Sequence, residues 1–252
     1  MAFYDLSKEQ RAETVARIKE DLRLDLQGVT WQRALRFFSD EDTYIRKAAY
    51  LSVGRLYFEE PVLQQLILGL LQLLHDSPDF RVRQTVINAA GEIGKRQFET
   101  VCSFFDRGLF DAHYSPRNAV IGSIKKMGEV NPVPVLDWAR GYLHHPDKEI
   151  RREVCHGIEL RGRTHPEDIL PLLQQLEHDP TQRVRSTLVH VIGQIAYKKG
   201  CIEKVVAHLK TWSNKQLVAD ALEEIIDVHD RYRNFSSLTQ EQARTYIEKH
   251  YN

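Results

Sequence analysis

The sequence predicts an all-α fold, a right-handed α-solenoid of stacked helix pairs. Three observations predict it: a segment that recurs about every 34 residues, an apolar stripe of helical spacing inside each copy, and the difficulty of placing a β-strand anywhere. One pair of amphipathic helices cannot bury its apolar face alone. The copies must therefore stack on one another to form a core.

The recurring segment is centred on an apolar residue followed by arginine, as in the second copy, DFRVRQTVINAAGEIG. In that copy Val82, Val86, Ile87, Ala90 and Ile93 lie one before and three, four, seven and ten after the arginine. This spacing follows one face of a helix with about 3.6 residues per turn. Five copies align, with separations of 37, 34, 34 and 34 residues between the arginines, which are Arg46, Arg83, Arg117, Arg151 and Arg185.

Each helix of this kind has a predicted start. Asp42, Asp79, Asp147 and Thr181 lie four residues before their arginines, where a side-chain oxygen can accept hydrogen bonds from the unpaired amides of the first turn. A second amphipathic segment precedes each start; we call it helix A, and the helix that carries the arginine helix B. The predicted A helices are WQRALRFF, PVLQQLILGLLQLL, ETVCSFFDRGLF, VPVLDWARGYL and PEDILPLLQQLEH.

The register also predicts where the array ends. A further step of 34 residues from Arg185 reaches Ala219, where the arginine is missing but the apolar stripe continues through Leu222 and Ile225. End repeats of solenoids are commonly atypical. We therefore predict one continuous domain with an N-terminal capping helix in residues 1–30, five repeats and the start of a sixth in 31–212, and a degenerate capping repeat with a C-terminal helix in 213–252.

The turn pattern Asp-x-x-hydrophobic-Arg and the small residues of AAGEIG resemble the short form of the HEAT-like repeat family over residues 31–212. Tetratricopeptide repeats have the same period, but their Trp, Leu-Gly, Tyr and terminal Pro signature is missing. The resemblance implies that the aligned arginines and the turn acids form a structural ladder between neighbouring repeats. It also implies that one face of the B helices lines a concave groove. The predicted ladder acids are Asp42, Asp79 and Asp147.

The groove positions follow from a helical wheel, on which residues one, five, eight, nine and twelve after the arginine point away from the apolar stripe. Basic side chains and histidines outnumber acids there, although the whole chain has 35 basic and 35 acidic residues. A polar groove of this kind can bind an acidic partner or phosphates, and the alternative is an ordinary solvated face with cations near helix C-termini. The candidate binding residues are Lys47, Arg55, Lys95, Lys125, Lys126, Arg152, His156, Arg163 and His190.

The neighbours Cys155 and His156 fall on different faces of their helix. Cys155 is four after Arg151 and belongs to the core row, whereas His156 is five after it and faces the groove. A thiolate and base pair is therefore not predicted. Arg161 breaks the pattern because it occupies a position that is apolar in the other copies. Either the helix ends early or this side chain reaches outward from a core row.

Other features exclude several classes of function. The three cysteines show no C-x-x-C spacing, and the eleven histidines show neither H-x-x-x-H nor H-E-x-x-H, so we predict neither disulfides, nor a metal site, nor a cofactor. Phosphate-binding glycine loops and a nucleophile elbow are also missing. The chain has no apolar segment long enough to cross a membrane and no signal peptide, and we expect a cytoplasmic monomer.

Residues 179–212 also resemble the HEAT-like repeats of the bacterial alkylpurine DNA glycosylases in their turn, their arginine and their closing tryptophan. This second resemblance implies DNA on a basic concave face, with an acidic residue beside aromatic side chains. None of the predicted groove positions is Trp or Asp, and Trp31, Trp138 and Trp212 fall in predicted A helices. Base excision is therefore not predicted.

The sequence favours a non-enzymatic HEAT-like scaffold that binds a macromolecular partner, most readily a protein, along the groove. The alternative is a nucleic-acid-binding repeat protein related to the glycosylases. A third possibility is a HEAT-like lyase or maturation factor for cofactor attachment, but no residue favours it over a scaffold.

Overall fold

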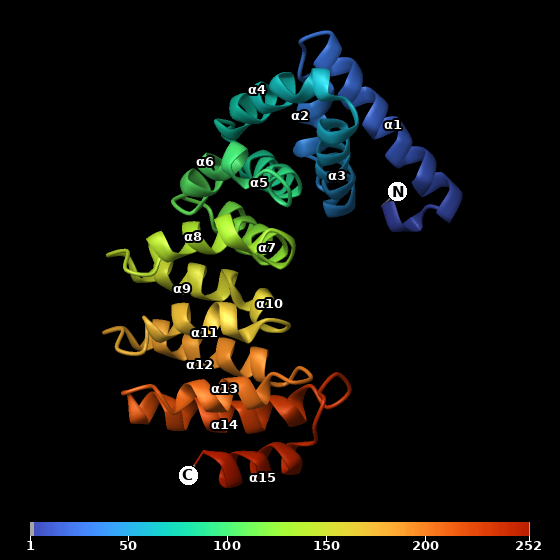
Figure 1. Ribbon diagram of the computed structural model, residues 1–252. Coiled ribbons are helices and arrows are strands. Elements are labelled where there is room, and N and C mark those ends of the chain that lie inside the picture. Colours follow the sequence, from blue (N-terminus) through green and yellow to red (C-terminus); the bar gives the residue numbers. More distant parts are fainter. Residues whose placement is uncertain (1–2, 252) are drawn as a thin grey trace. The chain divides into compact units, whose positions relative to one another are not determined.

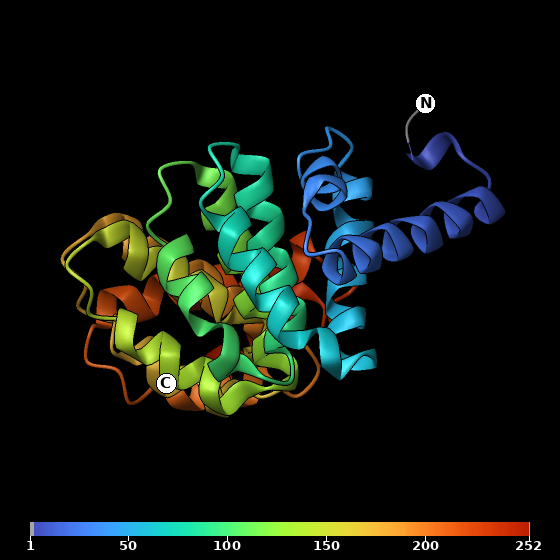
Figure 2. The same cartoon turned by 90° about the horizontal axis from the view of Figure 1, so that it is seen from above.

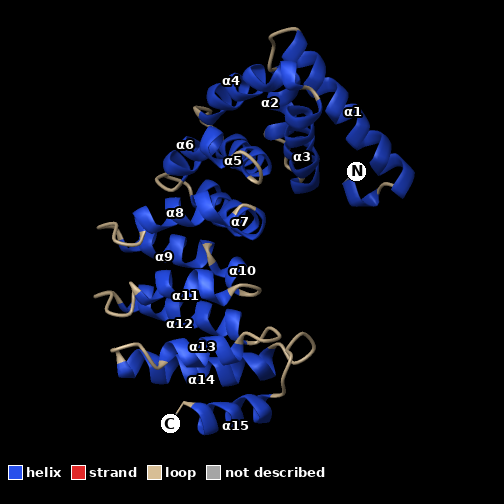
Figure 3. Ribbon diagram, in the orientation of Figure 1, coloured by secondary structure: helices blue, strands red, loops and turns tan. Residues whose placement is uncertain are grey.

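The computed structural model describes residues 3–251, which are helical and contain no β-strand (Figure 3). The all-α prediction is therefore confirmed. Among these residues, no helix combines the length and apolar character that crossing a bilayer requires. The chain forms two compact units, Met1–Ser123 and Ile124–Asn252, and helix α7 (Tyr114–Val130) contains the junction.

Unit 1 consists of helix pairs that follow a long first helix (Figure 1). The A helices are α2, α4 and α6, the B helices are α3 and α5, and α3 packs on α5 and on α1. In Figure 2, α1 extends well beyond α2 on its N-terminal side. The elements are η1 (Phe3–Asp5), α1 (Lys8–Gln27), α2 (Gln32–Phe38), α3 (Thr43–Glu59), η2 (Pro61–Leu63), α4 (Gln64–His75), α5 (Phe80–Gly94) and α6 (Phe98–Gly108).

Unit 2 continues the pattern after the end of α7. Its B helices pack on one another, α9 and α10 against α12 and α12 against α14, and the A helices α11 and α13 also lie side by side (Figure 1). The elements are α8 (Pro132–Tyr142), α9 (Lys148–Gly157), α10 (Glu159–Gly162), α11 (Pro166–Gln174), α12 (Gln182–Ala196), α13 (Ile202–Leu209), α14 (Lys215–Arg231) and α15 (Gln240–His250).

The predicted core rows are buried. Val82, Val86, Ile87, Ala90 and Ile93 of α5 are all 0% exposed. In α12 the equivalent residues are buried as well, except Val189, which is partly exposed and lines a surface pocket. The apolar stripe read from the sequence is thus the face on which each unit packs.

The first and last α-helices begin at polar residues that satisfy their first amides. Ser7 and Thr239 form capping boxes with Gln10 and Gln242 at the starts of α1 and α15. The predicted start of α2 falls at Trp31, whose side chain cannot accept a hydrogen bond from the first-turn amides. Asp25 of α1 caps α2 instead. The Asp25 carboxylate is fully buried and accepts hydrogen bonds from the Ala34 amide and the Arg33 guanidinium, both at 2.9 Å.

The B helices show the same rule with one exception. Asp42, Asp79 and Asp147 each accept a hydrogen bond of 2.8 Å from the amide two residues later. Thr181 occupies the equivalent place, but its side chain makes no capping hydrogen bond. Its hydroxyl instead accepts from Arg151 Nη2 at 3.3 Å, so the prediction of a side-chain cap at Thr181 is wrong.

Each aligned arginine folds back onto the turn that precedes its helix. Its Nη1 donates to the carbonyl oxygen six residues earlier, for example from Arg83 to Ser77 at 2.8 Å and from Arg151 to His145 at 2.7 Å. This bond satisfies a turn carbonyl that the helix itself cannot reach. The same bond is made by Arg46, Arg117 and Arg185 to Asp40, Asp111 and Asp179.

Two of these arginines also reach the next repeat. Arg83 binds both carboxylate oxygens of Asp111 at 2.7 and 2.9 Å within unit 1, and Arg151 binds those of Asp179 at 2.5 and 3.1 Å within unit 2. Burial alone would raise the pKa of Asp179, but the hydrogen bonds from Arg151 and from the Thr181 amide lower it below its ordinary value. The acids that bridge two repeats are thus Asp111 and Asp179, six residues before an arginine, whereas the acids four residues before cap their own helices.

Replacing Arg151 with methionine should destabilise the protein by about 3–5 kcal/mol, because it leaves the buried Asp179 carboxylate without its cation. Arg140→Ala is the matched control, since Arg140 forms a solvent-exposed pair with Asp137 and should contribute less than about 1 kcal/mol. Denaturant unfolding measures the free energy of unfolding of both variants. Equal losses would contradict the larger contribution expected of the buried Arg151–Asp179 pair.

Candidate functional site

The surface of interest is the B face, which we define as the solvent side of the B helices at the positions one, five, eight, nine and twelve after each arginine. In unit 1 it is formed by α3, α5 and the part of α7 up to Ser123, and in unit 2 by the rest of α7 and by α9, α10, α12 and α14. Each unit carries one distinctive cluster on this face. The predicted binding residues are distributed between the two.

In unit 1 the B face is hollowed between the C-terminal ends of α3 and α5. The cavity has a volume of about 420 Å³, and we call it the unit 1 pocket. The Arg96 guanidinium lies over the Phe58 ring at 4.8 Å, and Lys95 Nζ lies 2.6 Å from Glu92 Oε2. The lining residues are Leu51, Gly54, Arg55, Phe58, Glu59, Glu92, Lys95 and Arg96.

Gly54 sets the width of this pocket. A Cβ atom at this position would lie 2.6 Å from Cβ of Glu92, so a larger residue would push α3 and α5 apart. Both pocket carboxylates are neutralised by lysines, Glu92 by Lys95 and Glu59 by Lys19 of α1. Arg55 is exposed and makes no ion pair within the described part of the chain. The pocket therefore presents two guanidinium groups beside an aromatic ring.

In unit 2 the B face is organised around Glu159, which is only 1% exposed. Its Oε2 atom lies 3.1 Å from Lys125 Nζ and 3.2 Å from His156 Nε2, and Arg163 Nη2 donates to Oε1. The side chains of Lys125, His156 and Arg163 are 22%, 34% and 25% exposed, so each is only partly covered. We call Lys125, His156, Glu159 and Arg163 the Glu159 cluster.

A helix break places Glu159 in this position. Helix α9 ends at Gly157 and α10 starts at Glu159, so the fourth B helix ends early, as one of the two alternatives for Arg161 required. Arg161 turns toward the next A helix, and its Nε donates to Asp168 Oδ2 at 2.8 Å. It thus holds α10 against the start of α11 and does not belong to the B face.

The charges of the cluster keep Glu159 ionised. Burial opposes ionisation, but the neighbouring His156, Lys125 and Arg163 outweigh it and lower the pKa of Glu159 to about 2. Lys125 Nζ also lies 2.9 Å from His156 Nε2. A protonated lysine has only donors, so His156 Nε2 accepts this bond in the tautomer that leaves it unprotonated. In the other tautomer the same nitrogen donates to Glu159 Oε2, which lies 3.2 Å away.

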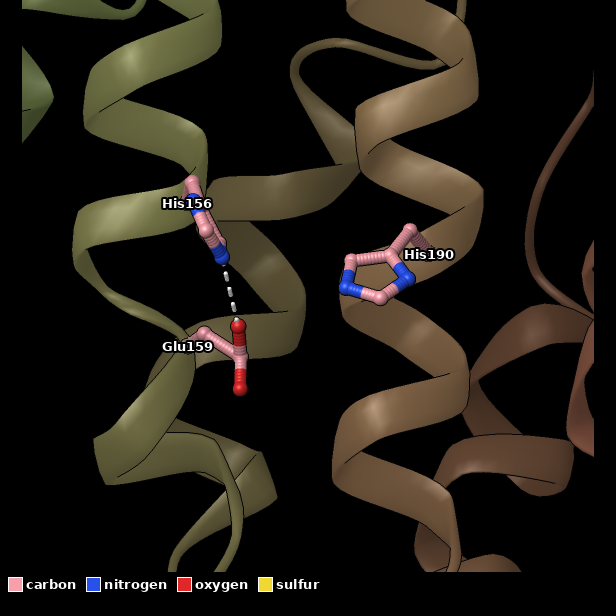
Figure 4. Close-up of side chains that lie close together, drawn as sticks. All are labelled: His156, Glu159 and His190. Carbon is pink, nitrogen blue, oxygen red and sulfur yellow. Dashed lines mark ion pairs between the residues drawn. The ribbon is translucent and has the colours of Figure 1, made fainter. Parts of the chain in front are cut away.

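Two further side chains border the Glu159 cluster. His190 of α12 faces it, with its ring centre 6.1 Å from that of His156 (Figure 4). Its Nδ1 lies 3.6 Å from Glu224 Oε1. Gln194, one turn further along α12, is buried and accepts a hydrogen bond of 3.0 Å from Arg163. The surroundings of Glu159 are therefore held in place from both α10 and α12.

The remaining predicted binding residues are less concentrated. Arg152 pairs with Glu149 at 2.9 Å and with Glu153 at 3.4 Å. Lys47 and Lys126 are exposed. The sequence-based charge count missed Glu149 and Glu153, which lie outside the chosen wheel positions. It also missed Glu224, which lies five after Ala219 in the atypical repeat that was not counted. It also left Glu159 out of the candidates, although an acid among cations at positions five and twelve was a visible signal.

Cys155 and His156 separate as the register predicts. Cys155 is 0% exposed, and burial raises the pKa of its thiol to about 12. His156 lies on the B face. A thiolate at this site is therefore strongly disfavoured at neutral pH.

Neither the family models nor the curated proteins compared with the chain match it. Several solved structures are similar to the chain at low sequence identity. The structure of smu.31 from Streptococcus mutans UA159 is 18% identical, with 83% of this chain and 96% of that one covered and a TM-score of 0.49. AlkD2 from Streptococcus mutans is 16% identical, with 83% and 96% covered and a TM-score of 0.49. A designed armadillo repeat protein is 14% identical, with 77% and 97% covered and a TM-score of 0.35.

The repeated helix pairs fit a HEAT-like solenoid, as the sequence predicted. The fold is argued from the helix pairs of this chain and not from these likenesses, whose TM-scores are below 0.5. Partner and activity must be argued from the side chains of this chain.

Stability should depend on the ionisation of Glu159. Its pKa is about 2 in the folded chain against an ordinary value of 4.5, so its contribution is complete above about pH 4.5 and is lost as the pH falls toward 2. The shift corresponds to about 3 kcal/mol. The difference in unfolding free energy between the wild type and Glu159→Gln should therefore shrink from pH 6 to pH 3. Glu129→Gln, at an exposed acid, is the control, and a Glu159 difference that is independent of pH would argue against this ionisation.

The cysteines should differ in reactivity. Cys155 and Cys201 are buried, and burial raises the pKa of both thiols, whereas Cys102 is partly exposed. Iodoacetamide at pH 8 should label Cys102 first and Cys155 only on unfolding, as mass spectrometry of tryptic peptides can show. Fast labelling of Cys155 in the folded protein would contradict its burial.

Proposed function

We propose that the chain is a non-enzymatic helical-repeat scaffold that binds an acidic segment of a protein partner on its B face. The observation that carries this proposal is the unit 1 pocket, where Arg55 and Arg96 stand beside Phe58 while both carboxylates of the pocket are already paired with lysines. Two guanidinium groups can each bind a carboxylate through paired N–H donors.

The pocket is organised before any partner arrives. The Arg96 side chain is stacked on Phe58, and Lys95 is tied to Glu92. Side chains that are already fixed lose little conformational freedom on binding, so more of the contact energy appears as affinity. The apolar floor of Phe58 and Leu51 also suits a partner segment that alternates acidic and apolar residues.

The scaffold part of the proposal follows from how the repeats are built. The buried rows and the buried arginine pairs make each unit a fixed surface. Cys155, the one nucleophile that the sequence places next to a histidine on a B helix, is inert through burial. These features support recognition rather than covalent chemistry.

Charge pairing favours an acidic peptide over duplex DNA. Affinity for DNA depends on how many phosphates are neutralised by available cations. In unit 2, however, Lys125, Arg152 and Arg163 are each engaged by a carboxylate. A short acidic segment needs only the few available guanidinium groups of the unit 1 pocket.

A fluorescent peptide of alternating aspartate and leucine should bind the purified chain in EDTA-containing buffer. Arg55→Glu combined with Arg96→Glu should weaken it about tenfold or more, because close opposite charges become like charges. Arg107→Glu is the matched control, since Arg107 is an exposed arginine of unit 1 on the A helix α6. Fluorescence anisotropy reads the affinity, and circular dichroism verifies that each variant is folded.

A 20-base-pair duplex is tested beside the peptide over a range of salt. Tighter binding of the duplex than of the peptide, with a steep fall as salt rises, would overturn the proposal in favour of a nucleic-acid partner. Peptide binding that survives the double charge reversal, or no binding of either ligand, also overturns it.

A further inference from the structure

The polar atoms of the Glu159 cluster converge on one point. Lys125 Nζ lies 2.9 Å from His156 Nε2 and 3.1 Å from Glu159 Oε2. The lysine can only donate, so it pairs with His156 in the tautomer whose Nε2 carries a lone pair. In that tautomer the nitrogen and the carboxylate oxygen, 3.2 Å apart, both present lone pairs to the same cation. This is the arrangement that a bound cation requires.

The spacing also suits a transition metal. Zinc bonds to imidazole nitrogen and carboxylate oxygen are about 2.0–2.2 Å long, which places neighbouring ligands of a tetrahedral site about 3.3–3.6 Å apart. The separation of 3.2 Å between His156 Nε2 and Glu159 Oε2 is close to this value. Two of the ligands therefore already stand at the distance that a tetrahedral metal needs.

His190 supplies a third ligand. His156, Glu159 and His190 each have a ligand atom within 4.8 Å of those of the others, and the His190 ring faces the other two (Figure 4). Its side chain is 43% exposed and can turn toward the other two without disturbing the core. The repeat explains the meeting: both histidines lie five after their arginines, so stacking of α9 on α12 brings residues 34 apart together.

Neighbouring side chains orient two of these ligands, Glu159 and His190. Arg163 donates to the second oxygen of Glu159, and Glu224 stands 3.6 Å from Nδ1 of His190. A carboxylate next to the outer nitrogen of a ligand histidine, and a hydrogen bond to a ligand carboxylate, are the usual outer partners of metal sites.

We propose that His156, Glu159 and His190 form a binding site for a divalent transition metal, with Zn²⁺ as the fitting probe, and that the Lys125 ammonium occupies this site when no metal is bound. Metal and ammonium are then alternatives, because both need the same two lone pairs. Two imidazoles and one carboxylate leave a coordination position for water or an external ligand. The site lies in unit 2 and does not depend on the partner proposed for the unit 1 pocket.

The sequence predicted no metal because it contains no histidine pair of helical spacing. The ligand atoms come instead from two repeats. His156 and Glu159 are three residues apart across the break between α9 and α10, and His190 lies 34 residues after His156, a spacing that no short pattern describes.

The test is titration of the whole chain with Co²⁺, whose visible absorption reports tetrahedral coordination, and with Zn²⁺ by calorimetry. We expect one site, weakened about tenfold or more by His156→Ala and by His190→Ala. His144→Ala and His178→Ala are matched controls at exposed histidines of the same unit and should leave the affinity unchanged. Glu159→Gln is less suited, because its ion pairs also support the fold.

Lys125→Met provides the decisive arm. Loss of the competing ammonium should raise the affinity about tenfold or more, a gain that adventitious binding by surface histidines does not predict. Unchanged or weaker binding in folded Lys125→Met overturns the proposal, as does an equal loss in the control histidine variants. Because the metal alone is measured, this result is separate from the peptide experiment.

Discussion

The guanidinium group near the start of five B helices is the interaction on which the repeats depend. Through Nη1 it donates a hydrogen bond to a turn carbonyl of its own repeat. In Arg83 and Arg151 the remaining N–H groups donate to the aspartate of the following turn. Arginine is suited to this because its planar fork serves several acceptors at once. One side chain thus fixes the turn within a repeat and the spacing to the next repeat.

This constraint explains why side chains on the B face meet at all. When Arg151 fixes the turn of the following repeat through Asp179, the positions five, eight and twelve after each arginine fall into rows across α9, α10 and α12. The Glu159 cluster lies where such rows come together. Small residues keep the rows close: a Cβ atom at Gly162 would lie 2.5 Å from Ile195 Cδ1, so α10 could not approach α12 with a larger residue there.

The sequence was sufficient for the helices, their register and the burial of their apolar rows, because these follow from a period repeated five times. It could not distinguish Thr181 from the capping aspartates, since which partner the hydroxyl takes depends on how near Arg151 comes in space. It could not assign Asp111 and Asp179 as bridging acids either, because they lie outside the turn pattern. Glu159 was left out of the candidates although the cations around it were visible in the sequence. A helical wheel shows which way a side chain points, but it does not show the burial that makes this carboxylate important.

The buried carboxylate of Glu159 then determines what its surroundings can do. A charge that is 1% exposed must be compensated, and Arg163 and Lys125 compensate it from two sides. Arg163 is also hydrogen-bonded to Gln194, whereas the lysine ammonium is a compact point charge on a flexible stem. The lysine is therefore the cation that can leave. If a divalent metal takes its place, the carboxylate remains compensated, and the lysine amine can reach the surface from a side chain that is already 22% exposed. The fold thus tolerates either cation in one site, and the exchange changes only the charge that the B face presents.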